Sequence, residues 1–193
     1  MSDQFSFYFK QGLFHVLDWS AYDHILFLLA LVVVFTIKDW KKTLWLITFF
    51  TIGHTLTLSL AAYNLIYVKE NLVEFSIAAT IFITALSNVL FQKKGTNRLN
   101  INIIFALLFG LIHGLGFSSY FKILVGREAG KALPLISFAA GVEVSQGILV
   151  IVLLTFTFIA LNIFKVTKRD WIMVISAIIL GITIPILYTR KFW

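Results

Sequence analysis

Residues 133–164 read LPLISFAAGVEVSQGILVIVLLTFTFIALNIF, and this stretch decides the class of fold. Glu143 is its only charged residue. Because about 20 mainly apolar residues are enough for a helix to cross the hydrocarbon core of a bilayer, the stretch is predicted to span a membrane. The whole chain shares this character: 60% of its 193 residues are hydrophobic and 13% are charged. Soluble domains carry about 25% charged residues, so a soluble globular domain is excluded.

Five further apolar stretches are separated from this one and from each other by short charged segments. The six predicted spans are residues 20–37, 43–66, 72–91, 101–121, 133–164 and 171–189. No shift in composition divides them, so we expect residues 1–193 to form one all-α domain, a polytopic bundle of six transmembrane helices. The first span is barely long enough to cross. The 17 residues before it mix aromatic and polar side chains, which predicts a short amphipathic helix lying on the membrane surface.

The lysine and arginine residues indicate the orientation of this bundle. Nine of the sixteen lie in the segments after the first, third and fifth spans. Such residues are enriched on the cytoplasmic side, so we expect both termini to lie outside. In a soluble protein the net charge of +7 would suggest nucleic-acid binding. Here basic loops facing anionic lipid explain it, so the expected partner is the bilayer and not a nucleic acid.

A small set of polar residues interrupts the apolar stretches. They are Asp23 and His24 in the first, His54 in the second, Glu74 in the third, His113 in the fourth, and Glu143 with Gln146 in the fifth, and His15 stands just before the first. A charged side chain at the centre of a bilayer costs at least about 2.5–3.5 kcal/mol on insertion scales, so each needs a structural or functional reason.

Three of these residues are predicted to reach the same depth. At a rise of about 1.5 Å per residue, His54, His113 and Glu143 lie roughly 15–18 Å inside their spans. Half of a hydrocarbon core of ~30 Å is about 15 Å, so we expect the three to share one midplane site. Gly110 and Gly114 form a GxxxG pair beside His113, which favours close approach of another helix.

Imidazole and carboxylate together suit nickel, cobalt, zinc or iron. The chain has no cysteine, which excludes a thiolate site. The predicted metal ligands are His24, His54, His113, Glu143 and Asp23, and the predicted supporting or pathway residues are His15, Glu74 and Gln146. Structural alternatives remain: a single buried histidine can be an interhelical hydrogen-bond donor, Glu143 with Gln146 can be a polar clamp, and His15 can be an ordinary interfacial residue.

Four blocks of sequence resemble the HupE/UreJ family of bacterial membrane proteins, which are regarded as nickel or cobalt permeases. The blocks are AYDHILF at 21–27, FTIGHTLTL at 50–58, FGLIHGLGF at 109–117, and GVE at 141–143 followed by Gln146. The segment around Val73 and Glu74 resembles a fifth, weaker block. The resemblance implies a multi-pass protein of the inner (cytoplasmic) membrane of a bacterium that handles nickel or cobalt as its substrate.

The leading hypothesis is therefore a permease for a divalent transition-metal ion, with zinc as a further candidate ion. The ion would pass Asp23, His24 and Glu74 from outside and bind at the midplane. The sequence contains no P-loop motif, so transport would be passive or coupled to a gradient. Two alternatives stay open: an intramembrane metalloenzyme acting on a lipid or acyl group, with Ser118 and Ser119 as participants, and a membrane subunit of a larger complex or homo-oligomer.

Overall fold

Helices make up all the regular secondary structure in the described part of the chain. The computed structural model describes residues 2–18, 22–91, 99–126, 128 and 130–191. The helices are α1 (Ser2–Leu17), α2 (Tyr22–Val32), α3 (Trp40–Ala62), α4 (Glu70–Leu90), α5 (Leu99–Gly116), α6 (Ser118–Leu124), α7 (Ala132–Phe158) and α8 (Lys168–Thr189). A 3-10 turn, Ile37–Asp39, precedes α3, and a π-helical turn, Ile159–Ile163, extends α7. The predicted all-α class is confirmed.

Four of these helices are long and apolar enough to cross a membrane alone: α3 with its 3-10 turn, α4, α7 with its π turn, and α8. Two helix pairs pass the same test only together. The pair α1 and α2 is bent by 68°, and the pair α5 and α6 is bent by 56°. If each bent pair is one span, the described residues contain up to six spans, which agrees with the predicted polytopic bundle.

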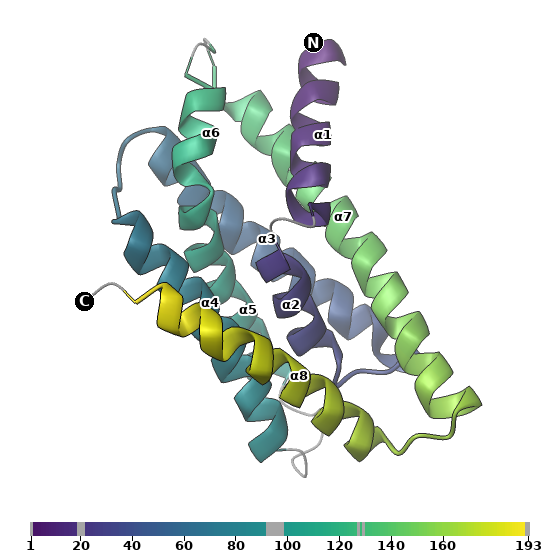
Figure 1. Ribbon diagram of the computed structural model, residues 1–193. Helices are drawn as coiled ribbons and strands as arrows, with labels where there is room; N and C mark the ends of the chain where they lie inside the picture. The colour runs from purple at the N-terminus through teal and green to yellow at the C-terminus, as the bar shows by residue number, and fades with distance from the viewer. Residues whose placement is uncertain (1, 19–21, 92–98, 127, 129, 192–193) are drawn as a thin grey trace.

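The first span differs from its prediction in where it begins. Helix α2 has 11 residues, about 16 Å, which is half of a ~30 Å hydrocarbon core. Helix α1 supplies the rest if the bent pair is one span. It packs lengthwise against α7 (Figure 1). Glycines allow this contact: an added Cβ on Gly12 would collide with the carbonyl oxygen of Phe138, and one on Gly141 with that of Phe9.

Helices α3 and α5 approach each other in the same way. An added Cβ on Gly110 would collide with the carbonyl oxygen of Phe50, and one on Gly53 with that of Leu107. Thr57 Oγ1 also donates a hydrogen bond to the Leu111 carbonyl oxygen across the two helices, at 2.8 Å. Small residues let helices meet closely where lipid is the competing neighbour, so this contact fixes the centre of the bundle.

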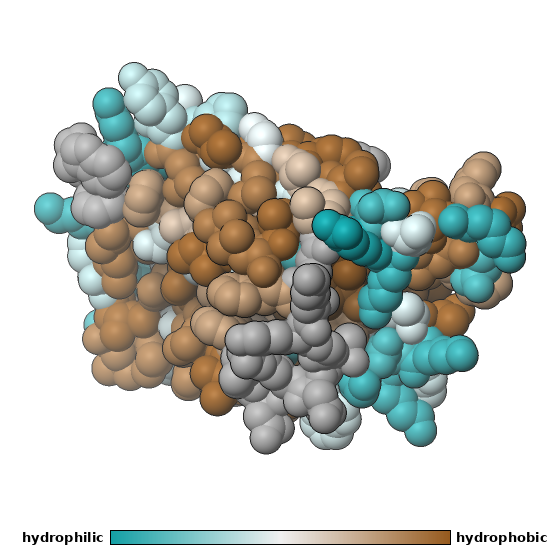
Figure 2. Space-filling model, turned by 90° about the horizontal axis from the view of Figure 1, so that it is seen from below, coloured by the Kyte–Doolittle hydropathy of each residue, from teal (hydrophilic) through white to brown (hydrophobic). Residues whose placement is uncertain are grey.

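Helix α2 lies in the interior, in contact with α4, α7 and α8 (Figure 1). Most of its residues are buried. Many large apolar side chains of the surrounding helices are instead exposed, among them Ile136, Ile151 and Ile184. Figure 2 shows hydrophobic residues covering much of one view, with hydrophilic residues gathered mainly toward one side. Lipid contact accounts for so much exposed apolar surface, which a soluble monomer rarely carries.

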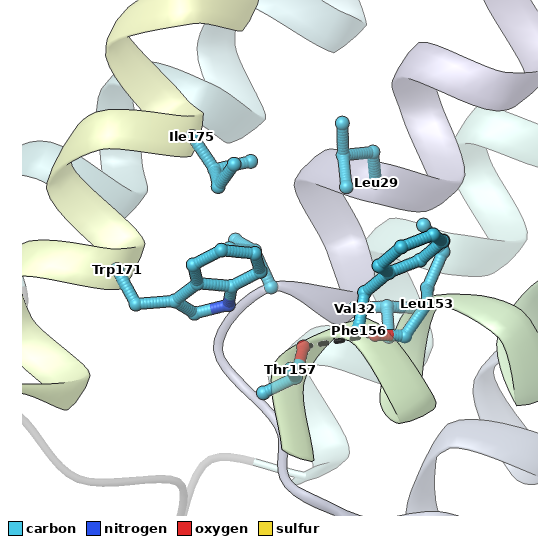
Figure 3. A pocket seen from close by; sticks show the side chains of 8 residues that line it. Leu29, Val32, Leu153, Phe156, Thr157, Trp171 and Ile175 are labelled. Carbon is cyan, nitrogen blue, oxygen red and sulfur yellow. Dashed lines mark hydrogen bonds between the residues drawn. The ribbon is translucent and has the colours of Figure 1, made fainter. Parts of the chain in front are cut away.

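An apolar pocket of about 180 Å³ opens between α2, α7 and α8 (Figure 3). Leu29, Phe156, Trp171 and Ile175 are among the residues that line it. The hydroxyl of Thr157, which also lines it, donates to the Leu153 carbonyl oxygen of its own helix at 3.0 Å. None of the histidines lines this pocket, so it is separate from the polar centre described next.

Candidate metal centre

All four histidines of the chain converge in the interior of the bundle, each from a different helix. They are His15 on α1, His24 on α2, His54 on α3 and His113 on α5. The ring centroids of His15 and His24 are 4.6 Å apart, those of His15 and His54 5.7 Å, and those of His24 and His113 5.4 Å. We call these four residues the histidine cluster.

Three members of the histidine cluster already form a candidate ligand set. One ring nitrogen each of His15, His24 and His54 lies within 4.8 Å of the other two. Among the residues that the structure describes, this is the one group of three or more potential ligands that meets the criterion. Ligand nitrogens about 2.0–2.1 Å from a tetrahedral metal ion lie about 3.3 Å apart, so small side-chain movements would complete such a site.

Breaks in two helices position these side chains. His15 and His24 stand on either side of the bend between α1 and α2, and His113 lies shortly before the bend between α5 and α6 at Phe117. Non-helical backbone at membrane depth is tolerated where it is buried in protein or lines a cavity. Discontinuous helices of this kind form the substrate and ion sites of many transporters.

Hydrogen bonds occupy one ring nitrogen of two of the histidines. His24 Nδ1 lies 3.0 Å from Asp23 Oδ1, which also accepts from the His24 backbone N–H at 2.8 Å. His113 Nδ1 lies 2.9 Å from the Phe109 carbonyl oxygen. A carbonyl oxygen only accepts, so this Nδ1 carries the proton and Nε2 is left as an acceptor. A carboxylate or carbonyl behind an imidazole is the usual support of a metal-ligating histidine.

Five further ring nitrogens of the histidine cluster have no partner. Nε2 is buried and without a hydrogen bond in His15, His24, His54 and His113, and so is Nδ1 of His54. Leaving a buried polar atom unsatisfied costs about 1–3 kcal/mol, so several in one place call for an explanation. A metal ion that accepts a lone pair from one nitrogen of each ring is one arrangement that satisfies most of them.

Phenylalanine rings close the histidine cluster on two sides. Toward the end where α3 and α5 begin, Phe27 and Phe50 pack 4.9 Å apart, with centroids 5.2 and 5.1 Å from that of His113. Phe109 joins this layer at 5.4 Å from Phe27. Toward the other end, the rings of Phe117 and His15 are 3.9 Å apart, and Phe138 and Phe121 pack behind them. His54 is 0% exposed and His113 1%, whereas His15 is partly exposed, so the cluster is enclosed except at His15.

The structure does not bring Glu143 or Gln146 into the histidine cluster. Thr48 Oγ1 of α3 donates to Glu143 Oε1 at 2.5 Å, and Thr51 Oγ1 donates to Gln146 Oε1 at 3.0 Å. Phe138 is the α7 residue that stacks on His54, with centroids 6.2 Å apart. Glu143 follows it by five residues, or about 7.5 Å, so the expected grouping of His54, His113 and Glu143 is not formed.

Asp23 and Glu74 lie at increasing distance from the histidine cluster. Asp23 stands behind His24 and also lines a crevice of about 10 Å³ between α2, α4 and α8, which Arg190 lines as well. Glu74 Oε2 is 3.8 Å from Arg190 Nε, and the Glu74 side chain is half-exposed. Asp23 therefore supports a histidine, whereas Glu74 belongs to the outer rim of this crevice.

Thr48 and Thr51 were not among the predicted site residues, and His15 was predicted only as a supporting or pathway residue. His15 was expected outside the bundle, yet it lies in the ligand set. The sequence feature that points to His15 is the short first span, because this span needs residues before position 20 to reach across a bilayer. Thr48 and Thr51 precede His54 by six and three residues, and spacing of three places side chains on one helix face.

Comparison with known proteins identifies the family of the chain. A family model described as HupE / UreJ protein matches residues 1–190. No curated protein and no solved structure matches the chain. The matched residues include α1 and every helix that contributes a histidine. The chain therefore belongs to the HupE/UreJ family.

Proposed function

We propose that the protein is a membrane permease for a divalent transition-metal ion, nickel or cobalt, and that the histidine cluster binds this ion during transport. The observation that carries the proposal is the set of buried, unpartnered ring nitrogens of His15, His24 and His54 within 4.8 Å of one another. Imidazole suits nickel, cobalt and zinc, and the absence of cysteine disfavours a soft copper site.

Each residue then has a separate role. His15, His24 and His54 are the ligands, and His113 stands beside His24 as a fourth imidazole with a free Nε2. Asp23 holds the His24 ring in one tautomer and places a negative charge near a divalent ion that three neutral imidazoles leave uncompensated. The midplane site of this proposal is therefore built of histidines, without Glu143.

The route to the histidine cluster supports transport. Asp23, beside His24, lines a crevice of about 10 Å³ together with Arg190, which contacts Glu74, so we expect the ion to approach His24 from this side. Phenylalanine layers occlude the cluster on two sides, so an ion that crosses either layer requires that layer to open. The bends at α1–α2 and α5–α6 lie beside the cluster and are the places where such a movement can occur.

A metalloenzyme would instead need an open coordination position for water and a substrate. The enclosed cluster offers no observation in favour of it. The Ser118 hydroxyl donates to the Leu115 carbonyl oxygen at 2.6 Å and is directed to its own helix. Transport is therefore the function that the geometry supports best.

Uptake by proteoliposomes tests the proposal. Purified protein should accumulate radioactive nickel or cobalt in vesicles, and His54→Ala should abolish the accumulation because a ligand is lost. Ser176→Ala, a buried polar substitution on α8, is the matched control and should transport as the wild type does. If the wild type accumulates neither ion, or if His54→Ala accumulates as much as the wild type, the proposal is wrong.

A further inference from the structure

A line of polar side chains leads away from the histidine cluster along α3. Thr48, Thr51 and His54 are spaced by three residues and share one face of the helix. On α7, Glu143 and Gln146 are spaced by three residues and meet the two threonines through the hydrogen bonds described above. We call Thr48, Thr51, Glu143 and Gln146 the oxygen cluster. It lies roughly 5–9 Å from His54 along α3, toward the basic segment that precedes this helix.

The oxygen cluster contains buried polar atoms that nothing satisfies. Glu143 Oε2 and Gln146 Nε2 are buried and have no hydrogen-bond partner. Gln146 is 0% exposed. The ion pairs found among the described residues join Asp23 to His24, Asp39 to Lys42 and Glu74 to Arg190, so none of them neutralises Glu143. A carboxylate within a transmembrane helix normally pairs with a positive charge, and a bound cation supplies one.

The donors of this cluster are oxygen atoms only. Glu143 contributes a carboxylate and the threonines contribute hydroxyls. The two ends of the Gln146 amide can be exchanged by rotating it by half a turn. Nε2 then donates to Thr51 Oγ1, and the carbonyl oxygen becomes free to bind a cation. The Thr51 hydroxyl keeps its bond to the Ile47 carbonyl oxygen at 3.1 Å. Oxygen ligands suit hard cations such as magnesium and manganese, whereas nickel and cobalt hold imidazole more firmly.

The layer formed by Phe27, Phe50 and Phe109 does not cover the line of polar side chains on α3. The Phe50 ring packs against Phe27 and His113, on the side of α3 that faces α2 and α5. The threonines face α7 instead. A cation can therefore leave His54 along the seam between α3 and α7 without crossing the three packed phenylalanine rings.

We propose that the oxygen cluster is a second cation site, a weaker station that receives the divalent ion from the histidine cluster on the side of the basic segment Lys38–Lys42. Its place in transport rests on the proposed function, but its ability to bind a divalent cation does not. Moving from nitrogen ligands to oxygen ligands lowers the affinity for nickel or cobalt, so the ion dissociates from this station more readily than it would from the histidine cluster directly.

Manganese binding to the purified full-length protein tests the site, because Mn²⁺ favours oxygen ligands and is detected by electron paramagnetic resonance. Glu143→Gln keeps the shape and an acceptor for Thr48 while removing the charge, and it should weaken Mn²⁺ binding at least tenfold. Glu70→Gln is the matched control, because its carboxylate is exposed at the start of α4 and its loss should leave Mn²⁺ binding unchanged. Thr48→Val should weaken Mn²⁺ binding by a smaller factor.

Two comparisons keep this proposal separate from the proposed function. His54→Ala should retain the Mn²⁺ site while losing high-affinity nickel binding, and Glu143→Gln should retain high-affinity nickel binding but slow nickel release into vesicles. Unchanged Mn²⁺ affinity in Glu143→Gln, or an equal loss in Glu70→Gln, would overturn the second site whatever the histidine variants do. Unchanged nickel affinity in His54→Ala would overturn the histidine site alone.

Discussion

At the scale of single residues, the tautomer of each imidazole determines what the histidine cluster can bind. Asp23 fixes His24, and the carbonyl oxygen of Phe109 fixes His113, so that each presents a nitrogen without a proton to the interior. These supports come from residues next to the histidine or one turn before it, so they move with the helix that carries the ligand.

Asp23→Asn should lower the nickel affinity by about 10–100-fold, the usual effect of losing a partner behind a ligand. The asparagine oxygen still accepts from His24 Nδ1, so binding should weaken and not disappear. Isothermal titration of nickel into the purified variant measures this. Asp39→Asn, whose carboxylate contacts Thr36 and Lys42 at a helix start, is the control and should bind nickel normally. An affinity of Asp23→Asn equal to that of the control would contradict the role of Asp23.

His15→Ala should abolish high-affinity nickel binding as completely as His54→Ala, because both residues supply a ligand nitrogen to the same group. Lys10→Ala changes an exposed side chain of the same helix and should have no effect. Equilibrium dialysis against nickel compares the three proteins. An interfacial His15 would instead leave the affinity of His15→Ala at the wild-type value.

The sequence identifies most of these residues, because a polar group inside an apolar stretch needs a reason. It also gives depth along each helix. The estimated depths were not accurate enough to separate Glu143 from the histidines: Glu143 meets Thr48, which lies about 9 Å from His54 along α3. His15 was misplaced for a different reason, since its helix joins the bundle through backbone contacts at Gly12 and Gly141 that hydropathy does not record.

At the scale of helices, glycine contacts hold the elements that carry the ligands. Gly110→Ala should separate α3 from α5, because the new Cβ would meet the carbonyl oxygen of Phe50, a backbone atom that cannot turn aside. Overpacking of this kind costs about 1–3 kcal/mol in the free energy of unfolding. Thermal unfolding in detergent should show a lower unfolding temperature, and nickel titration should show a lower affinity.

Gly147→Ala is the matched control for this substitution. An added Cβ on Gly147, which lies on α7, meets nothing within 4 Å. Its unfolding temperature and nickel affinity should stay at the wild-type values. Equal behaviour of the two variants would mean that the close approach of α3 and α5 does not matter for the site.

The helix boundaries illustrate what hydropathy can predict. The expected spans 72–91, 133–164 and 171–189 correspond closely to Glu70–Leu90, Ala132–Ile163 and Lys168–Thr189. The bend at Phe117 was not predicted, because the apolar run continues through it and no proline marks it. At that bend the ring of Phe117 packs against those of His15 and Phe138, which belong to distant segments of the chain.

At the scale of the whole molecule, the basic loops predict its orientation. The chain has no cysteine, so single cysteines can be introduced as reporters without a background. Asp3→Cys lies at the start of α1 and Lys168→Cys at the start of α8, and both positions are exposed. A membrane-impermeant maleimide should label Asp3→Cys in intact cells and Lys168→Cys only after permeabilisation. The reverse pattern would place the termini inside.

The central claim is that one metal ion binds between three helices at the histidine cluster, and anomalous diffraction from crystals of the protein with cobalt tests it most directly. We predict a cobalt peak about 2.1 Å from a ring nitrogen of each of His15, His24 and His54. Crystals that show ordered cobalt only elsewhere, or a cobalt ion with no imidazole ligand, would contradict the account.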